Sequence, residues 1–412
     1  MLTRIIMVGA AALLPLCVHA QTAPTDTRPL ALAEAIELAI AANPGLRAAR
    51  LGVAVAAADT SQAGSLPNPE LALLQEGTAR GTRTRTVQIS QRLELGGKRA
   101  ARIGLADGDR RVAVLDVAVA QAELRADVTA AWFDALIAQE RFALAQASLQ
   151  LAQKATDAAT RRVAAGRISP IEQSRSQVAR SAVQLEVAQA VTGLALAQSR
   201  LAAFWAAQPT RPLAGAPAEQ PLPPLEVLLQ RLDDAPRVRR ALSQVEREGA
   251  RVRLERSRRM PDVSVTLGTK RDDEIGRNQA VVGLSIPLPL FDRNAGAELA
   301  ALRQADRAGA ELEAERIGLT QALTQAWRRA ELAQAEVNTI RNDILPAAQG
   351  AYDAAVTGFE LGKFAFLDVM DAQRTLFQIR ARYLAALAER YRAGADIERC
   401  LPLAATPTGN TP

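Results

Sequence analysis

The sequence contains an internal repeat, and a chain with such a duplication folds into two similar units. NPGLRAAR at 43–50 aligns with APRVRRAL at 235–242, and TVQISQRLEL at 86–95 aligns with VVGLSIPLPL at 281–290. Further matches in the same order are Pro67 with Pro261, Trp132 with Trp327, and Gly166 with Gly362. Matches that keep their order and spacing indicate an internal duplication. Each copy is too long for a solenoid repeat, so we expect two large structural repeats in tandem.

The copies are joined by a proline-rich stretch, QPTRPLAGAPAEQPLPP, which cannot continue a helix and is typical of an extended linker. This divides the chain into parts. We expect a first repeat over 21–207, a linker over 208–224, a second repeat over 225–398 and a C-terminal tail over 399–412.

The N-terminus has the pattern of a secretory signal peptide over 1–20. Arg4 precedes an apolar run, and Val18-His19-Ala20 resembles a cleavage site. Cys17 follows Leu16, where a lipoprotein signal needs a small residue, so we expect cleavage after Ala20 without lipidation. Cleavage removes the single histidine and leaves Cys400 as the remaining cysteine. Chemistry that uses imidazole or paired thiolates is thereby excluded, and we expect no catalytic residue, no cofactor and no metal site.

Long helices dominate each repeat. Residues 109–165 contain neither glycine nor proline and are rich in strong helix formers. A continuous helix from Gly97 to Gly166 would reach on the order of 100 Å at ~1.5 Å per residue. Gly166 and Gly362 then end the outgoing helices, because glycine adopts the left-handed conformation at little cost. We expect helical hairpins over about 98–206 and 294–395, with a break near Pro346.

Two alternating segments precede each hairpin and predict strands over about 67–77, 84–95, 260–270 and 279–290. Each has one apolar and one polar face over about ten residues, which is typical of a strand that crosses a bilayer in a closed barrel. A transmembrane helix is not expected, because no mature segment is long and apolar enough. Four strands cannot close a barrel, and open edges are not tolerated in lipid, so several chains must share one.

Two strand-to-helix junctions and one turn carry a family resemblance. They are ISQRLELGGKRAAR at 89–102, SIPLPLFDRNAGAE at 285–298, and the run from Phe359 through Gly362 to Asp368, Val369, Asp371 and Ala372. Together with LPNPEL at 66–71, these resemble the TolC-like outer-membrane efflux protein family. More narrowly, they are similar to its heavy-metal subgroup, the CzcC-like cobalt-zinc-cadmium resistance proteins.

The resemblance implies a fold that is mainly α with a small β part. Three chains would assemble into a twelve-stranded outer-membrane β-barrel, continued by an α-helical barrel across the periplasm of a Gram-negative bacterium. The implied partners are two further copies in a homotrimer, a periplasmic adaptor (membrane fusion) protein, an inner-membrane resistance-nodulation-division pump that is driven by protons, and outer-membrane lipid. The implied activity is passive export of divalent heavy-metal cations.

The same resemblance assigns roles at the hairpin turns. Asp368 and Asp371 match aspartates that constrict the pore entrance, and their i, i+3 spacing puts both on one helix face. Their alternative role is stabilisation of a helix N-terminus. The turns at Gly166 and Gly362, with Arg167 and Lys363, are the expected adaptor contacts. Glu172 could form a tip latch with one of these bases; the alternative is an ordinary solvated charge.

Other functions remain as alternatives. The chain could be an exit duct for organic toxicants, because specificity in such systems resides in the pump. It could also be a periplasmic coiled-coil adaptor, although an adaptor of this kind would not explain why each strand has an apolar face suited to contact with lipid. An enzyme is disfavoured, because the chain lacks a glycine-rich phosphate loop and the mature chain expected after cleavage lacks histidine. Nucleic-acid binding is also disfavoured, since the net charge of +6 comes from interspersed bases and acids.

Overall fold

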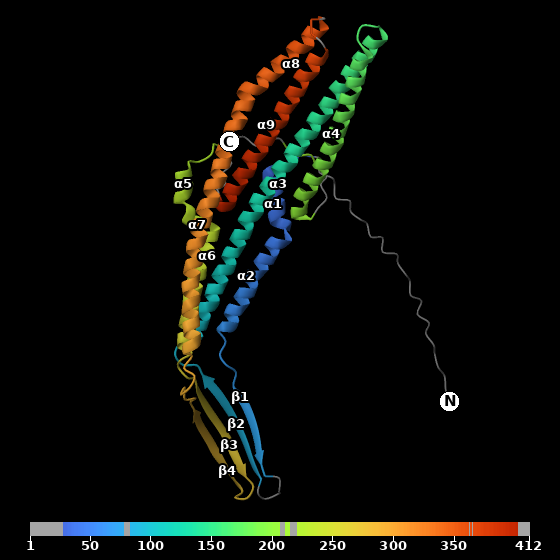
Figure 1. The fold of residues 1–412 in the computed structure, drawn as a ribbon. Helices are drawn as coiled ribbons and strands as arrows, with labels where there is room; N and C mark the ends of the chain where they lie inside the picture. The colour runs from blue at the N-terminus through green and yellow to red at the C-terminus, as the bar shows by residue number, and fades with distance from the viewer. Residues whose placement is uncertain are drawn as a thin grey trace, which may run out of the picture.

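The computed structural model describes residues 28–77, 83–206, 211–214, 221–361, 363–364 and 366–402. The signal-peptide prediction, with Cys17 and His19, and the predicted turn residue Gly362 lie outside the described residues. The molecule is an elongated rod with a small sheet at one end and two helical hairpins at the other (Figure 1).

The first repeat contains two short helices, two strands and a long helical hairpin. In chain order they are α1 (Leu32–Ala42), α2 (Pro44–Ala63), β1 (Glu70–Glu76), β2 (Thr84–Leu93), α3 (Lys98–Ala164) and α4 (Pro170–Ala202), followed by a 3-10 turn, η1 (Ala203–Trp205). Asn43 ends α1 and caps α2, because its side chain accepts a hydrogen bond from the Leu46 N–H at 3.0 Å. Helix α3 spans 67 residues, so it runs for about 100 Å.

The second repeat follows the same order. It contains α5 (Leu225–Gln230), the 3-10 turn η2 (Leu232–Asp234), α6 (Pro236–Ser257), β3 (Val263–Asp272), β4 (Arg277–Ser285), α7 (Ala295–Thr339), the π turn η3 (Ile340–Ile344), α8 (Leu345–Glu360) and α9 (Phe366–Cys400). None of the described helices is both long enough and apolar enough to cross a membrane.

The break expected near Pro346 takes the form of the π turn η3. A proline within a helix cannot donate a backbone hydrogen bond, and its ring clashes with the carbonyl four residues earlier. The wider turn directly before it lets the Leu345 N–H bond to the Ile340 carbonyl instead. The outgoing helix of the second hairpin therefore continues through α8 rather than ending.

The four strands form one antiparallel sheet in the order β1-β2-β3-β4. Strands β2 and β3 come from different repeats and pair along their whole length, from Thr84 opposite Asp272 to Leu93 opposite Val263. This central pairing joins the two repeats at the sheet end of the rod. Strands β1 and β4 are the outer strands of the sheet within one chain.

Both strand-to-helix junctions use a left-handed residue just before the long helix. Gly97 precedes α3 at φ 71°, and Asn294 precedes α7 at φ 57°. In the first junction Arg102 donates to both carboxylate oxygens of Glu94, at 2.6 and 3.1 Å. In the second junction the Asn294 amide donates to the backbone carbonyl of Glu255 at 2.9 Å. Two of the motifs that carry the family resemblance are therefore the corners that connect each strand to its long helix.

Several predicted boundaries differ from the structure. The strand expected over 279–290 ends at Ser285, because Pro287 and Pro289 cannot donate to a neighbouring strand. The first-repeat strand likewise ends at Leu93 instead of residue 95. At the C-terminus α9 continues to Cys400, and Leu401 is buried in the second-repeat core, so the helical repeat extends into the tail expected over 399–412.

The expected linker over 208–224 is anchored where the structure describes it. Leu213 forms a parallel β-bridge with Leu30 and is buried. Arg211 forms a two-pronged ion pair with Glu34, at 2.7 and 3.2 Å. The segment after the first hairpin therefore binds the start of the same repeat.

The two equivalent tryptophans fix the start of each repeat. Trp132 on α3 is fully buried and donates its indole N–H to the Leu30 carbonyl at 3.3 Å. Trp327 on α7 donates to the Pro223 carbonyl at 2.8 Å. Each indole thus holds the segment that enters its own repeat, which is a duplicated contact as well as a duplicated residue. Phe133 and Tyr391 stack beside Trp132, with ring centroids 3.5 Å apart.

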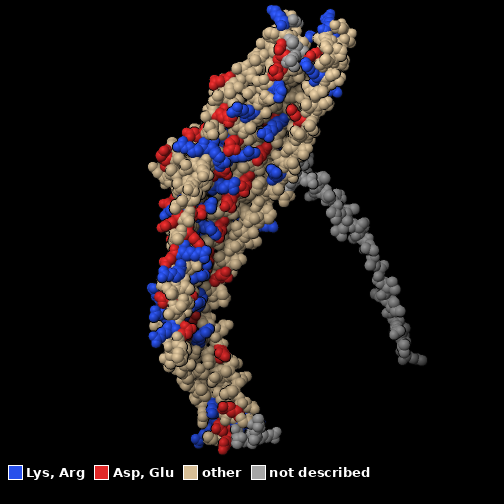
Figure 2. Space-filling view, viewed as in Figure 1, with Lys and Arg blue, Asp and Glu red and all other residues tan. Residues whose placement is uncertain are grey.

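Charged pairs join the repeats along the rod (Figure 2 shows both signs interspersed on the helices). Arg392 and Arg399 on α9 pair with Asp134 and Asp127 on α3, at 2.7 and 2.6 Å. Nearer the sheet, Arg247 on α6 bonds the buried carboxylate of Glu248 at 2.6 Å and also reaches α3. Partly exposed pairs each contribute little to stability, but their spacing fixes the register of α3 against α6 and α9.

Truncation of Trp132 should destabilise the protein strongly. Trp132→Ala leaves a large cavity and is expected to lower the unfolding free energy by about 3–5 kcal/mol. Trp132→Phe keeps most of the packing and removes the indole donor, for a loss of about 1 kcal/mol. Thermal melting of detergent-solubilised protein, followed by circular dichroism, measures both. Equal melting temperatures for the two variants would show that the site is not packed as described.

Candidate functional site

The sheet has one apolar and one polar face. Leu71, Ile89, Leu267 and Val282 lie opposite one another on successive strands, so they form a single row across the sheet. All four are exposed in the single chain. A soluble sheet would bury such a row against a core, whereas none of the described helices covers it here (Figure 1). This apolar face requires a non-aqueous environment.

The opposite face of the sheet carries polar side chains. The Ser90 and Thr266 hydroxyls, one from each repeat, form a cross-strand hydrogen bond at 2.8 Å. Gln88 and Thr86 lie on the same face of β2, and Lys270 is opposite Thr86. A sheet with one apolar and one polar face is suited to a wall between lipid and a water-filled channel.

The first helical turn lies at the opposite end of the rod from the sheet. Gly166 has φ 67°, and the Arg167 N–H bonds back to the Arg162 carbonyl at 2.9 Å, which closes the C-terminus of α3. Ser169 caps α4 by accepting from the Ile171 N–H at 3.3 Å, and Pro170 occupies the first turn. Arg167 is exposed at the tip.

The second helical turn depends on a glycine that sequence reasoning missed. The N–H groups of Lys363 and Phe364 both bond to the Gly358 carbonyl, at 2.8 and 3.2 Å. The Phe364 ring lies directly on Gly358, where an added Cβ would stand only 2.2 Å from the ring. Any larger residue at 358 would push the ring away. Phe364 is therefore the residue that folds this turn onto α8.

A cation–π contact joins the tips of the two hairpins in the part of the chain that the structure describes. The Arg162 guanidinium, near the end of α3, lies over the Phe359 ring of α8 at 3.8 Å from the centroid. This is a cation–π interaction between repeats, about 0.5–1 kcal/mol at an exposed site. Sequence reasoning placed a latch at Glu172 with Arg167 or Lys363; the observed partner of Glu172 is Arg175 on its own helix, at 3.1 Å. Sequence reasoning assigned no role to Arg162.

The predicted pore aspartates lie in the first turns of α9. Asp368 and Asp371 are both exposed. Asp371 lines a groove of about 1120 Å³ between the two hairpins, and Glu172 and Arg175 line the same groove from α4. The structure thus brings Asp371 and Glu172 to one groove, whereas Asp368 lies outside the groove's lining.

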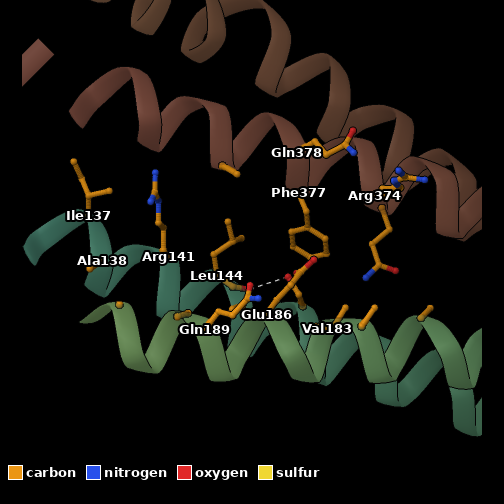
Figure 3. Close-up of a pocket in the computed structure, with 18 of the residues that line it drawn as sticks. Ile137, Ala138, Arg141, Leu144, Val183, Glu186, Gln189, Arg374, Phe377 and Gln378 are labelled. Atoms are coloured by element: carbon orange, nitrogen blue, oxygen red, sulfur yellow. Dashed lines mark hydrogen bonds between the residues drawn. The ribbon is translucent and has the colours of Figure 1, made fainter. Parts of the chain in front are cut away.

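The groove combines apolar and charged walls (Figure 3). Phe377 reaches from α9 toward α3 and α4, and Arg141 reaches from α3 toward α9. Glu186 lines the α4 side. Among the described residues, no cluster of three or more His, Cys, Asp or Glu side chains could hold a metal ion. The groove therefore offers weak, mixed contacts rather than a tight metal site.

These features define a class of protein. An amphipathic sheet with two open outer edges, attached to helical hairpins whose outgoing helix is about 100 Å long in the first repeat, is typical of a subunit of an outer-membrane channel that extends through the periplasm. The sequence profile described as "Outer membrane efflux protein" matches residues 35–207 and 227–401, and the chain belongs to that family.

Individual relatives agree with this assignment. The chain is 43% identical over 379 residues to the cobalt-zinc-cadmium resistance protein CzcC of Cupriavidus metallidurans, with 90% of each chain covered. It is 28% identical to the nickel-cobalt-cadmium resistance protein NccC of Alcaligenes xylosoxydans xylosoxydans, which covers 68% of this chain and 66% of the relative. The Campylobacter jejuni CmeC outer membrane channel shares the fold, with a TM-score of 0.77 and 14% identity over 90% and 85% of the two chains.

The expected fold, location and lack of enzymatic activity are confirmed. The protein is an outer-membrane channel component with a periplasmic helical extension, and it is not an enzyme. Channels of this family work as trimers with adaptor and inner-membrane pump partners. The alternative of a periplasmic coiled-coil adaptor is therefore wrong.

Loss of the Arg162 guanidinium should loosen the tip. We expect Arg162→Gln to raise the fraction of time that single channels spend in high-conductance states by about 2–5-fold, because about 0.5–1 kcal/mol of hairpin contact is lost. Planar-bilayer recordings measure this. Arg161→Gln removes the same charge one residue away and is the matched control. Identical currents for both variants would show that the contact does not restrain the tip.

Proposed function

We propose that the protein is the outer-membrane exit duct of a tripartite, proton-driven efflux system that exports divalent heavy-metal cations such as cobalt, zinc and cadmium. The supporting observation is the 43% identity to CzcC across 90% of both chains. The duct itself performs passive transport, and its partner pump supplies the energy.

Assembly as a homotrimer is supported by the two open sheet edges of each chain, because further copies can pair with them. Three copies would supply twelve strands, and β4 of one copy would pair with β1 of the next. A second surface supports the same assembly. Ile171, Val178 and Leu185 are exposed on α4 at heptad spacing, and α4 packs on α3 at one edge of the helical layer. We assign this stripe to the neighbouring copy.

The tip residues are assigned to the remaining partners. Arg167 and Lys363 are exposed at the two turns. With Gly166 and Gly362, they form the proposed contact for a periplasmic adaptor protein. The adaptor would connect the duct to a resistance-nodulation-division pump in the inner membrane, while the apolar sheet face contacts outer-membrane lipid.

A metal-tolerance panel tests the proposed cargo. We expect a strain without this protein to lose tolerance to zinc, cobalt and cadmium by several-fold, and re-expression to restore it. Tolerance to organic toxicants should not change. Minimum inhibitory concentrations measure both groups. Sensitivity to organic toxicants with normal metal tolerance would instead support the alternative, an exit duct for organic compounds.

We also propose that Asp368 and Asp371 form the pore entrance. Both are exposed on the first two turns of α9, three residues apart. Around a threefold axis, two carboxylates from each copy would surround the opening and favour cations over anions. In the turn before α9, the Phe364 ring packs on Gly358 of α8.

Replacement of both aspartates tests this ring. Asp368→Asn with Asp371→Asn should reduce the cation-to-anion permeability ratio and weaken block by divalent cations, because the fixed negative field is removed. Reversal potentials in salt gradients across planar bilayers measure the ratio. Asp353→Asn, which removes an exposed carboxylate from α8, is the control. If the double variant and the control have the same selectivity as the parent protein, the aspartates do not line the pore.

A further inference from the structure

The apolar face of β4 continues beyond the end of the strand. Val282 and Leu284 are exposed on β4, and the same alternation continues through Ile286, Leu288 and Leu290 although the strand ends at Ser285. Phe291 follows with 99% of its surface exposed. Pro287 and Pro289 occupy the intervening positions. We call residues 286–291 the collar segment.

The strand alone is too short for the membrane. Residues 280–285 are the part of β4 that follows the charged and amide side chains of Arg277, Asn278 and Gln279. At ~3.3 Å per residue they span about 20 Å, and a tilt of about 40° leaves about 15 Å of height. The apolar band of an outer-membrane barrel is about 25 Å tall. The collar segment is also free of charge and could supply the missing height up to Asp292.

Phe291 is also unusual because it lies in a long stretch of sequence that has no other aromatic residue. No other Phe, Trp or Tyr occurs between Trp205 and Trp327, and none precedes Trp132. The sheet region therefore lacks the aromatic girdles that normally mark both membrane boundaries, apart from this one ring. Asp292 and Arg293 follow directly, and both are exposed. The chain thus changes from the apolar collar segment to charged residues immediately after Phe291, which is the only aromatic residue between Trp205 and Trp327.

We propose that the collar segment lies in the periplasmic leaflet of the outer membrane, with Phe291 at the boundary between acyl chains and headgroups. Its partner is phospholipid, since the segment continues the sheet face that meets lipid and ends in charged residues at the water side. The membrane boundary therefore lies beyond the hydrogen-bonded end of β4, and a trimer would present three such rings. This inference rests on the outer-membrane location and not on which cargo is exported.

Tryptophan fluorescence tests the position of residue 291. The variant Phe291→Trp is purified as the full-length trimer and inserted into phosphatidylcholine vesicles that carry bromine at different acyl depths. The parent protein gives the background of Trp132, Trp205 and Trp327, which is subtracted. We expect the added emission to be blue-shifted and to lose about half or more of its intensity, most strongly with bromine close to the headgroups.

A matched control uses Leu332→Trp on α7, which is exposed but lies on the long helix away from the sheet. It should not be quenched at any bromine depth. For position 291, water-like emission without quenching would place the collar in the periplasm, and blue-shifted emission without quenching would place it against a neighbouring protein chain. Either result overturns the proposal. Metal tolerance of a strain that expresses Phe291→Trp reports on the cargo separately.

Discussion

The backbone groups at the two sheet edges impose the main constraint on this molecule. In hydrocarbon, every unpaired N–H and C=O costs several kcal/mol, because no water can replace the missing partner. One chain pairs β1 through β4 but leaves the outer edges of β1 and β4 without partners in the sheet. When further copies pair with β1 and β4 and close the sheet into a barrel, no open edge remains. Pairing of these edges is thus a condition for the stability of the strands in lipid.

The long helices also suit a closed tube that is built from several copies of the chain. A tube made from a few chains needs long helices that pack side by side, and small side chains allow close approach along their whole length. The core residues of α3 and α7 are accordingly rich in alanine, such as Ala126, Ala135 and Ala326. The large side chains of Trp132 and Trp327 hold the segments that enter each repeat. The duplication therefore gives each hairpin the same anchor at the same height.

Most of the helices, strands and turns of this fold could be predicted from the sequence, because they depend on hydrophobic periodicity and on the positions of Gly and Pro. The long helix α3 follows from an uninterrupted run of helix formers, and the strands follow from alternation. Boundaries were less predictable: alternation continues through Ile286 and Leu288, yet Pro287 and Pro289 end the hydrogen-bonded strand at Ser285. The contact of Arg162 with Phe359 was not predictable, because it joins residues that are distant in sequence through a geometry that no spacing encodes. The role of Gly358 depends likewise on a ring that folds back from Phe364.

The distribution of contacts between the repeats indicates where the molecule can move. At the sheet end, β2 and β3 pair through continuous backbone hydrogen bonds. Along the middle of the rod, ion pairs such as Arg392 with Asp134 join α9 to α3. Farther along, the hairpins flank a groove of about 1120 Å³, and at the described tips Arg162 lies over Phe359. Contact strength therefore falls from the membrane to the tip. A movement that separates the hairpins at the tip would break a weak cation–π contact and leave the sheet pairing intact, so the hairpins can part at the tip without disturbing the sheet.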